Sequence, residues 1–319
     1  MTTVLLRVGL MAWLLWGTLA AAQPYPSKPV RLLVPFPPGG STDLVARTFS
    51  PRFAELLGQQ VVIEYKGGAG GSIGAAEVAR APADGYSLLV VWDTHGVNHH
   101  VYKVAYDPFR SFEHISLLVQ APGILVATPS FPPSTVRELT DYATANPERV
   151  TYASAGTGSS NHLSALLFSK MAGIRMTHVP YKGGGPIIAD LIGGHVQILF
   201  GSLPLFTEHV RSGKMKALAV LSRERLAQFP NIPAAAETLP GFEARTWFGF
   251  LAPAGTPREI ITRLNQDVVR ALSDPKVKEA FSSRGFDVVA STPEAFAAFV
   301  KRESDTWGAL IREAGIRAE

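Results

Sequence analysis

The chain has 319 residues, of which 46% are hydrophobic and 18% charged, and its formal net charge is +4. This length fits two domains of about 150 residues each, and the composition excludes a disordered chain or a membrane bundle. No run of five or six lysines or arginines occurs, so the charge pattern does not indicate nucleic-acid binding.

The first 22 residues have the pattern of a secretory signal peptide. Arg7 precedes an apolar run from Val8 to Ala20, and Ala20-Ala21-Ala22 is a small-residue cleavage site that predicts Gln23 as the mature start. The apolar run is too short to cross about 30 Å of hydrocarbon. The chain has no cysteine, which removes disulfides, thiol nucleophiles and a site for lipid attachment. We therefore expect a protein that is free in an extracytoplasmic space, a bacterial periplasm, and not a lipoprotein.

Strands and helices then alternate with short connections rich in glycine, proline and serine. The first series predicts strands over 29–36, 61–65 and 87–93 and helices over 42–57, with a kink at Pro51, and 72–80. The second series predicts strands over 123–127, 150–155, 176–179, 196–200 and 215–221. Its helices are one capped by Ser134 or Thr135 and stopped at Asn146-Pro147, and others over 160–171, 186–192 and 205–212. Apolar strands separated by helices indicate parallel βα units.

The C-terminal part has a different character. Residues 222–245 are rich in proline and glycine and form a connecting segment, followed by a strand over 247–251 and amphipathic helices over 257–272 and 293–314. These elements are too few for a third domain, so we expect the chain to return to the first. The prediction is an α/β fold of two lobes joined by crossing strands, residues 23–122 plus 246–319 and residues 123–245, with a ligand cleft between them.

Three glycine-rich loops, over 35–43, 66–74 and 153–162, each join a predicted strand to a predicted helix. Loops at the carboxyl ends of parallel strands line the ligand crevice of an open sheet. Glycine lets a ligand approach the backbone, and a helix start offers unpaired N–H groups at a positive dipole end. Such loops can hold a carboxylate without a lysine or arginine. The alternative is that they are tight turns, with Ser41, Ser72 and Ser159 or Ser160 as simple helix caps.

Two catalytic or cofactor motifs compete for the second loop. Residues 70–74 match the G-x-S-x-G nucleophile elbow, which makes a serine-dependent acyl hydrolase using Ser72 the alternative function. Glycines separate this serine from its strand, however, and no histidine or acid is placed by spacing. The same stretch is one residue off the dinucleotide fingerprint, but it is the second βα loop, and Asp84 lies in a turn rather than at a strand end.

The histidines His95, His99 and His100 are spaced so that a helix could place two of them on one face to bind a metal. A polar loop after a strand explains them more simply, because Asp93 is the one carboxylate nearby. We expect no metal, no cofactor and no enzyme activity.

The loops in this order resemble the Bug family (Bordetella uptake genes), the extracytoplasmic receptors of tripartite tricarboxylate transporters. The resemblance covers residues 24–319, and its matching stretches are 25–30, 35–43, 68–71, 84–86, 94–98, 106–108, 152–159, 178–183 and 251–257. The resemblance implies a Venus-flytrap periplasmic binding protein fold of type II, with two crossovers. It also implies a small organic acid as ligand and a two-component membrane permease as partner. We expect the receptor itself to be a monomer.

The resemblance further implies that backbone N–H groups and waters hold the ligand's carboxylates. The candidate binding residues are Phe36, Pro38, Gly39, Gly40, Ser41, Thr42, Thr94, His95, Ser154, Gly156, Thr157, Gly158 and Ser159. One position departs from the family pattern, because Gly201 stands where an aspartate is common. If that aspartate faces the cleft, its loss here disfavours a ligand with an amino group.

Overall fold

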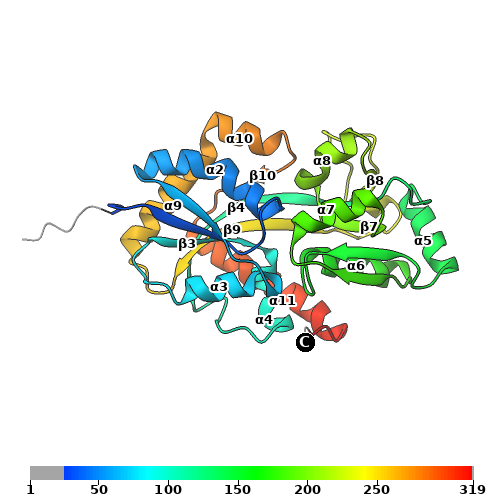
Figure 1. Cartoon of the computed structure of the whole chain (residues 1–319), viewed down its shortest axis with the longest axis horizontal. Helices are drawn as coiled ribbons and strands as arrows, with labels where there is room; N and C mark the ends of the chain where they lie inside the picture. Colours follow the sequence, from blue (N-terminus) through cyan, green and yellow to red (C-terminus); the bar gives the residue numbers. More distant parts are fainter. Residues whose placement is uncertain (1–24, 318–319) are drawn as a thin grey trace, which may run out of the picture.

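The computed structural model describes residues 25–317 (Figure 1). The predicted signal peptide over residues 1–22 lies outside this range. Within the described residues, no helix combines the length and hydrophobicity needed to cross a membrane.

The first lobe is built on one half of the sheet, at the left of Figure 1. Strands β2 (Val61–Tyr65), β1 (Val30–Val34) and β3 (Ser87–Trp92) are parallel neighbours, and β9 (Arg245–Pro253) and β4 (Phe112–Ala127) follow antiparallel, with the short β10 (Asp287–Val288) beside β4. Its helices are α2 (Ser41–Leu57), α3 (Ser72–Ala79), α4 (Asn98–Val101), α9 (Arg258–Ser273), α10 (Pro275–Ser282) and α11 (Pro293–Glu313), with 3-10 turns over Ala69–Gly71 and Asp93–Gly96. Phe49 and Phe53 of α2 pack edge-on against Phe250 of β9, which fixes α2 on this sheet.

The second lobe continues from the far end of β4. There β4 pairs antiparallel with β7 (Ile198–Ser202) and β8 (Lys216–Val220), while β5 (Thr151–Ser154) lies parallel to β7 and to β6 (Thr177–Pro180). Its helices are α5 (Val136–Ala145), α6 (Ser160–Ala172), α7 (Gly184–Gly193) and α8 (Leu203–Arg211), with a 3-10 turn over Ala235–Glu237. A core that includes Phe168, Phe200 and Phe242 holds this lobe together.

Two chain segments cross between the lobes, as expected. Strand β4 runs through both halves of the sheet, and the segment that enters β9 at Arg245 is the return crossing. Three backbone hydrogen bonds join these segments to the end of β8: from Gly123 N to Ala244 O, from Ala244 N to Leu221 O, and from Leu221 N to Gly123 O. The two-lobed α/β fold with two crossovers is therefore confirmed.

The structure corrects two local predictions. The strand predicted over 123–127 is the end of the much longer β4, because His114, Ser116 and Gln120 interrupt the apolar pattern of its first part. Helix α10 was missed because Pro275 reads as a helix stop, whereas it occupies the first turn after the cap Asp274, whose side chain accepts from Lys276 N and Val277 N. The helix predicted over 42–57, by contrast, agrees with α2, which runs through Pro51 and ends before Gly58.

Gly123 is the position where the crossing strands leave no space for a side chain. A Cβ there would lie 2.7 Å from Leu221 Cδ1 and 3.0 Å from the carbonyl oxygen of Ala244. We predict that Gly123→Ala lowers the free energy of unfolding by about 1–3 kcal/mol, measured by urea denaturation. Gly96→Ala is the control, because its Cβ would meet nothing closer than 3.5 Å. Equal stability of the two variants would contradict this view of the crossing.

Candidate ligand-binding site

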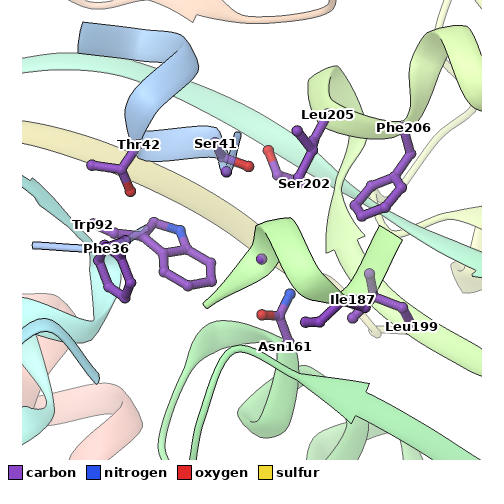
Figure 2. Close-up of a pocket in the computed structure, with 12 residues that line it drawn as sticks. Phe36, Ser41, Thr42, Trp92, Asn161, Ile187, Leu199, Ser202, Leu205 and Phe206 are labelled. Atoms are coloured by element: carbon purple, nitrogen blue, oxygen red, sulfur yellow. The ribbon is translucent and has the colours of Figure 1, made fainter. Parts of the chain in front are cut away.

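An enclosed cavity lies between the two lobes (Figure 2). Its volume is about 20 Å³, measured as the space open to water centres, which is room for one or two waters. The first lobe contributes Phe36, Gly40, Ser41, Thr42 and Trp92, and the second contributes Asn161, Gly184, Ile187, Leu199, Ser202, Leu205 and Phe206. None of these residues carries a formal charge, and six of them are large and apolar.

Four helices begin at this cavity. Gly40 precedes the first residue of α2, Gly184 is the first residue of α7, Asn161 is the second residue of α6, and Ser202 precedes α8. The first turn of a helix leaves N–H groups without intrahelical partners, and each helix start carries roughly half a positive charge. The cavity therefore has a positive potential although no cationic side chain from residues 25–317 lines it.

The N-termini of α2 and α7 face each other from opposite lobes. A Cβ at Gly40 would lie 3.9 Å from the backbone nitrogens of both Gly184 and Gly185. Within residues 25–317, the N–H groups of Gly40, Ser41, Gly184 and Gly185 donate no hydrogen bond. Two positive helix ends at this distance repel one another, and an anion placed between them would satisfy both.

The Ser154–Ser159 loop differs from the starts of α2 and α7, because most of its backbone N–H groups have hydrogen-bond partners. Gly156 N donates to Ser154 Oγ (3.2 Å), Gly158 N to His162 Nδ1 (3.0 Å), and Ser159 N to Gly156 O (3.1 Å). Most of the loop's donors are thus used internally. Thr157 is the exception, because its N–H has no partner among the described residues.

The predicted site residues fall into three groups. Phe36, Gly40, Ser41 and Thr42 line the enclosed cavity, whereas Gly156 and Thr157 line a second cavity that also includes Phe36. The remaining residues of the two loops line neither cavity: Pro38 and Gly39 are exposed, Ser154 and Ser159 are buried loop supports, and Gly158 is close to Val101.

Thr94 and His95 also lie away from both cavities. The His95 ring stacks on Tyr106 and meets the edge of Phe112 inside the first lobe. Burial lowers the pKa of His95 to about 3, so the ring is neutral at physiological pH. Among residues 25–317, no group of three or more histidines and carboxylates is arranged to hold a metal ion.

The sequence interpretation missed the cavity residues Trp92, Asn161, Gly184, Ile187, Leu199, Ser202, Leu205 and Phe206. Most are apolar residues in or beside strands and helices, which read as ordinary core. The run Gly183-Gly184-Gly185 before α7 was a usable signal, since it repeats the glycine-then-helix pattern of the other loops. Ser202 gives a structural signal instead: its Oγ is buried and has no partner within the described chain, which marks a place for a water or ligand atom.

A short hydrogen-bond chain ties the cavity wall to the crossing strand. Trp92 Nε1 donates to Thr246 Oγ1 in β9, and Thr246 Oγ1 donates to Asp93 Oδ2 at 2.6 Å. Burial raises the pKa of Asp93 to about 8, although the hydrogen bond from Thr246 acts in the opposite direction. The carboxyl of Asp93 is therefore largely protonated at neutral pH.

The raised pKa of Asp93 predicts how the free energy of unfolding depends on pH. The folded chain holds the Asp93 proton between about pH 4 and pH 8, whereas the unfolded chain releases it, so this group's contribution falls as pH rises through that window. We expect the stability of Asp93→Asn relative to wild type to increase from pH 5 to pH 9 in urea denaturation. Asp141→Asn, at an exposed position, is the control. Parallel pH profiles for Asp93→Asn and wild type would show that Asp93 is ionised in the fold.

Comparison with known proteins identifies the family. The model of the tripartite tricarboxylate transporter family receptor matches residues 45–316. Protein BugT of Bordetella pertussis is 36% identical over 301 residues, which cover 93% of this chain and 92% of BugT. A protein from the tcbD-tcbE intergenic region of a Pseudomonas strain is 37% identical over 92% of this chain and 88% of its own length.

Solved structures agree in fold. The periplasmic binding protein BugD superposes with a TM-score of 0.88 at 37% identity, covering 92% of this chain and all of BugD. Rpa4515 of Rhodopseudomonas palustris, solved with adipate, has a TM-score of 0.89 at 34% identity over 92% of this chain and 100% of its own. MatC of the same organism, solved with malate, has a TM-score of 0.86 at 34% identity over 90% of this chain and 100% of its own.

The matching family is one of transporter receptors and BugD is a periplasmic binding protein, so the comparisons do not support the hydrolase alternative at Ser72. Ser72 itself follows a 3-10 turn rather than a strand, unlike the serine of a nucleophile elbow. The chain belongs to the receptor family of the tripartite tricarboxylate transporters and is a solute-binding protein of the Bug type.

Proposed function

We propose that this receptor captures a small organic acid by holding one carboxylate between the N-termini of α2 and α7 as the two lobes close. The observation that carries the proposal is the pair of facing helix starts, Gly40–Ser41 and Gly184–Gly185, whose N–H groups are unpaired within residues 25–317. Each start comes from a different lobe, so the carboxylate would join the lobes directly.

The binding free energy that these N–H groups could supply is adequate for a transport receptor. Hydrogen bonds to a charged group contribute roughly 1.5–3 kcal/mol each. Three or four such bonds therefore reach about −8 kcal/mol, which corresponds to micromolar binding. Because the donors are fixed backbone groups inside a closed cavity, salt would screen them less than it screens exposed charges.

The cavity wall also restricts the rest of the ligand. Phe36 and Trp92 meet edge to face at 5.5 Å between ring centroids, and both line the cavity. A Cβ at Gly201 would lie 2.4 Å from Phe206 Cε2, so the Phe206 ring already occupies the space that a side chain at position 201 would need. With an apolar ring there in place of a carboxylate, the cavity favours an acid without an amino group. The relatives solved with adipate and malate fit this class.

We also propose the biological setting. Residues 23–122 plus 246–319 and residues 123–245 would move as two units around the crossing segments near 121–124 and 222–246. The mature chain would start at Gln23 and act in the periplasm as a monomer, and the closed form would dock on a two-component permease.

A screen of about a hundred organic acids by thermal shift tests the proposal. An acid present at 100 times its Kd adds about 2.7 kcal/mol to stability, which is several degrees in Tm for a chain of this size. We expect small carboxylates without amino groups to give the largest shifts. A screen in which carboxylates as a class produce no shift, while another chemical class does, would contradict the proposal.

A substitution at Gly40 tests ligand binding without disturbing the fold. Its φ of −89° is accessible to any residue, and a Cβ there would be no closer than 3.9 Å to any neighbour. The added methyl would nevertheless occupy the gap between the two helix starts. We predict that Gly40→Ala weakens carboxylate binding at least tenfold in calorimetry, with Tm within about 2 °C of wild type. Gly96→Ala is again the matched control. Unchanged affinity in Gly40→Ala would place the carboxylate elsewhere.

A further inference from the structure

The lobes also meet at a second interface, where α4 and α11 of the first lobe contact α6 of the second. Val97, Val101 and Ile311 of the first lobe form one buried apolar cluster with Leu163 of α6, and none of these side chains is more than 4% exposed. Figure 1 shows the last turns of α11 below α6. The cluster is thus shared between the lobes, and separating the lobes would expose apolar surface on both sides.

Two polar contacts cross the same interface. Tyr102 Oη, directly after α4, donates to the carbonyl oxygen of Thr157 at 2.8 Å. Lys170 Nζ of α6 pairs with Glu313 Oε1 at the end of α11 at 2.5 Å, but both side chains are more than half exposed. An exposed ion pair contributes little to stability. The partly buried hydrogen bond from Tyr102 is therefore the polar contact that matters here, and it holds the loop of Thr157 against the first lobe.

Gly158 allows this loop to approach α4 closely. Its φ is 76°, and a Cβ there would lie 2.5 Å from Val101 Cγ2. The positive φ and the lack of space both favour glycine. The loop and α4 are thus in direct contact in this arrangement of the lobes.

The interface is nevertheless not a continuous core. A groove of about 390 Å³ lies between α6 and α11, with Leu166 and Lys170 on one side and Leu310 and Ala314 on the other. Protein cores contain few voids larger than a water molecule. The contact therefore has the form of two surfaces that can separate when the lobes move.

The two interfaces between the lobes act in opposite directions. The facing N-termini of α2 and α7 repel each other when no anion lies between them, whereas the contacts of α4 and α11 with α6 favour closure. We propose that the contacts around Tyr102, Val101 and Ile311 form a latch, which holds part of the receptor closed without a ligand and so raises its affinity for every ligand of the closed form. Apparent affinity scales with the fraction of protein that is competent to bind, so the latch acts without touching the ligand. This inference rests on the lobe movement proposed above, but not on where the carboxylate binds.

Distances between spin labels on the two lobes, measured by pulsed electron resonance on dialysed protein without added ligand, test the latch. The chain has no cysteine, so labels can be placed at Ile73→Cys in α3 and Ile192→Cys in α7, which are exposed positions on different lobes. We expect two distances, one from the closed and one from the open form. Tyr102→Phe removes only the hydroxyl and should lower the ratio of closed to open about three- to tenfold. Ile311→Ala should lower it by at least about tenfold.

Tyr142→Phe and Ile261→Ala are the matched controls. Tyr142 packs on Phe131 within the second lobe, and Ile261 is buried in α9 of the first. Both variants should keep the ratio within about twofold of wild type. Distance distributions that are the same in wild type and in both latch variants would overturn the inference, as would an equal shift in the controls. Neither result affects the carboxylate site, because the calorimetry of Gly40→Ala tests that site separately.

Discussion

The structure depends on an electrostatic conflict between its two lobes. Helices α2 and α7 point their positive N-terminal ends at each other, close enough that a methyl group at Gly40 would touch the backbone nitrogens of α7. In the part of the chain that the structure describes, no acidic side chain lines the cavity between them. Closed lobes without a ligand would therefore hold two unsatisfied helix ends together, and the proposed carboxylate would relieve this repulsion. Binding of a carboxylate at this place would therefore favour closure of the lobes.

A hydrogen bond links the cavity wall to the crossing strands. Trp92 forms part of the cavity wall, and its indole is hydrogen-bonded to Thr246 in β9, one residue beyond the start of the return crossing. At the same crossing, Gly123, Leu221 and Ala244 share a closed set of backbone hydrogen bonds. The cavity wall and the crossing segments are thus connected through covalent neighbours and hydrogen bonds.

Sequence patterns predicted the fold well where the physical signal is local. Apolar strands with intervening helices gave the βα series, and the glycine loops located the start of α2. They failed where the signal depends on tertiary contacts. The first part of β4 carries polar residues because its neighbours β9 and β10 supply the pairing.

The role of Gly158 could not be predicted from the sequence either, since its lack of a side chain serves a close approach to Val101 of the other lobe. The apolar wall of the site, from Trp92 to Phe206, is indistinguishable from core in a sequence. The 183–185 glycine run was readable, and its place opposite Gly40 required the folded structure.

In the proposed complex, the backbone N–H groups at the starts of α2 and α7 bind the ligand's carboxylate. Amide proton and nitrogen chemical shifts, recorded during titration with the tightest acid from the screen, test it most directly. Formation of charge-assisted hydrogen bonds predicts large downfield proton shifts for Gly40, Ser41, Gly184 and Gly185 that saturate together with one Kd. Saturating changes confined to other residues, with these four amides unmoved, would contradict the claim.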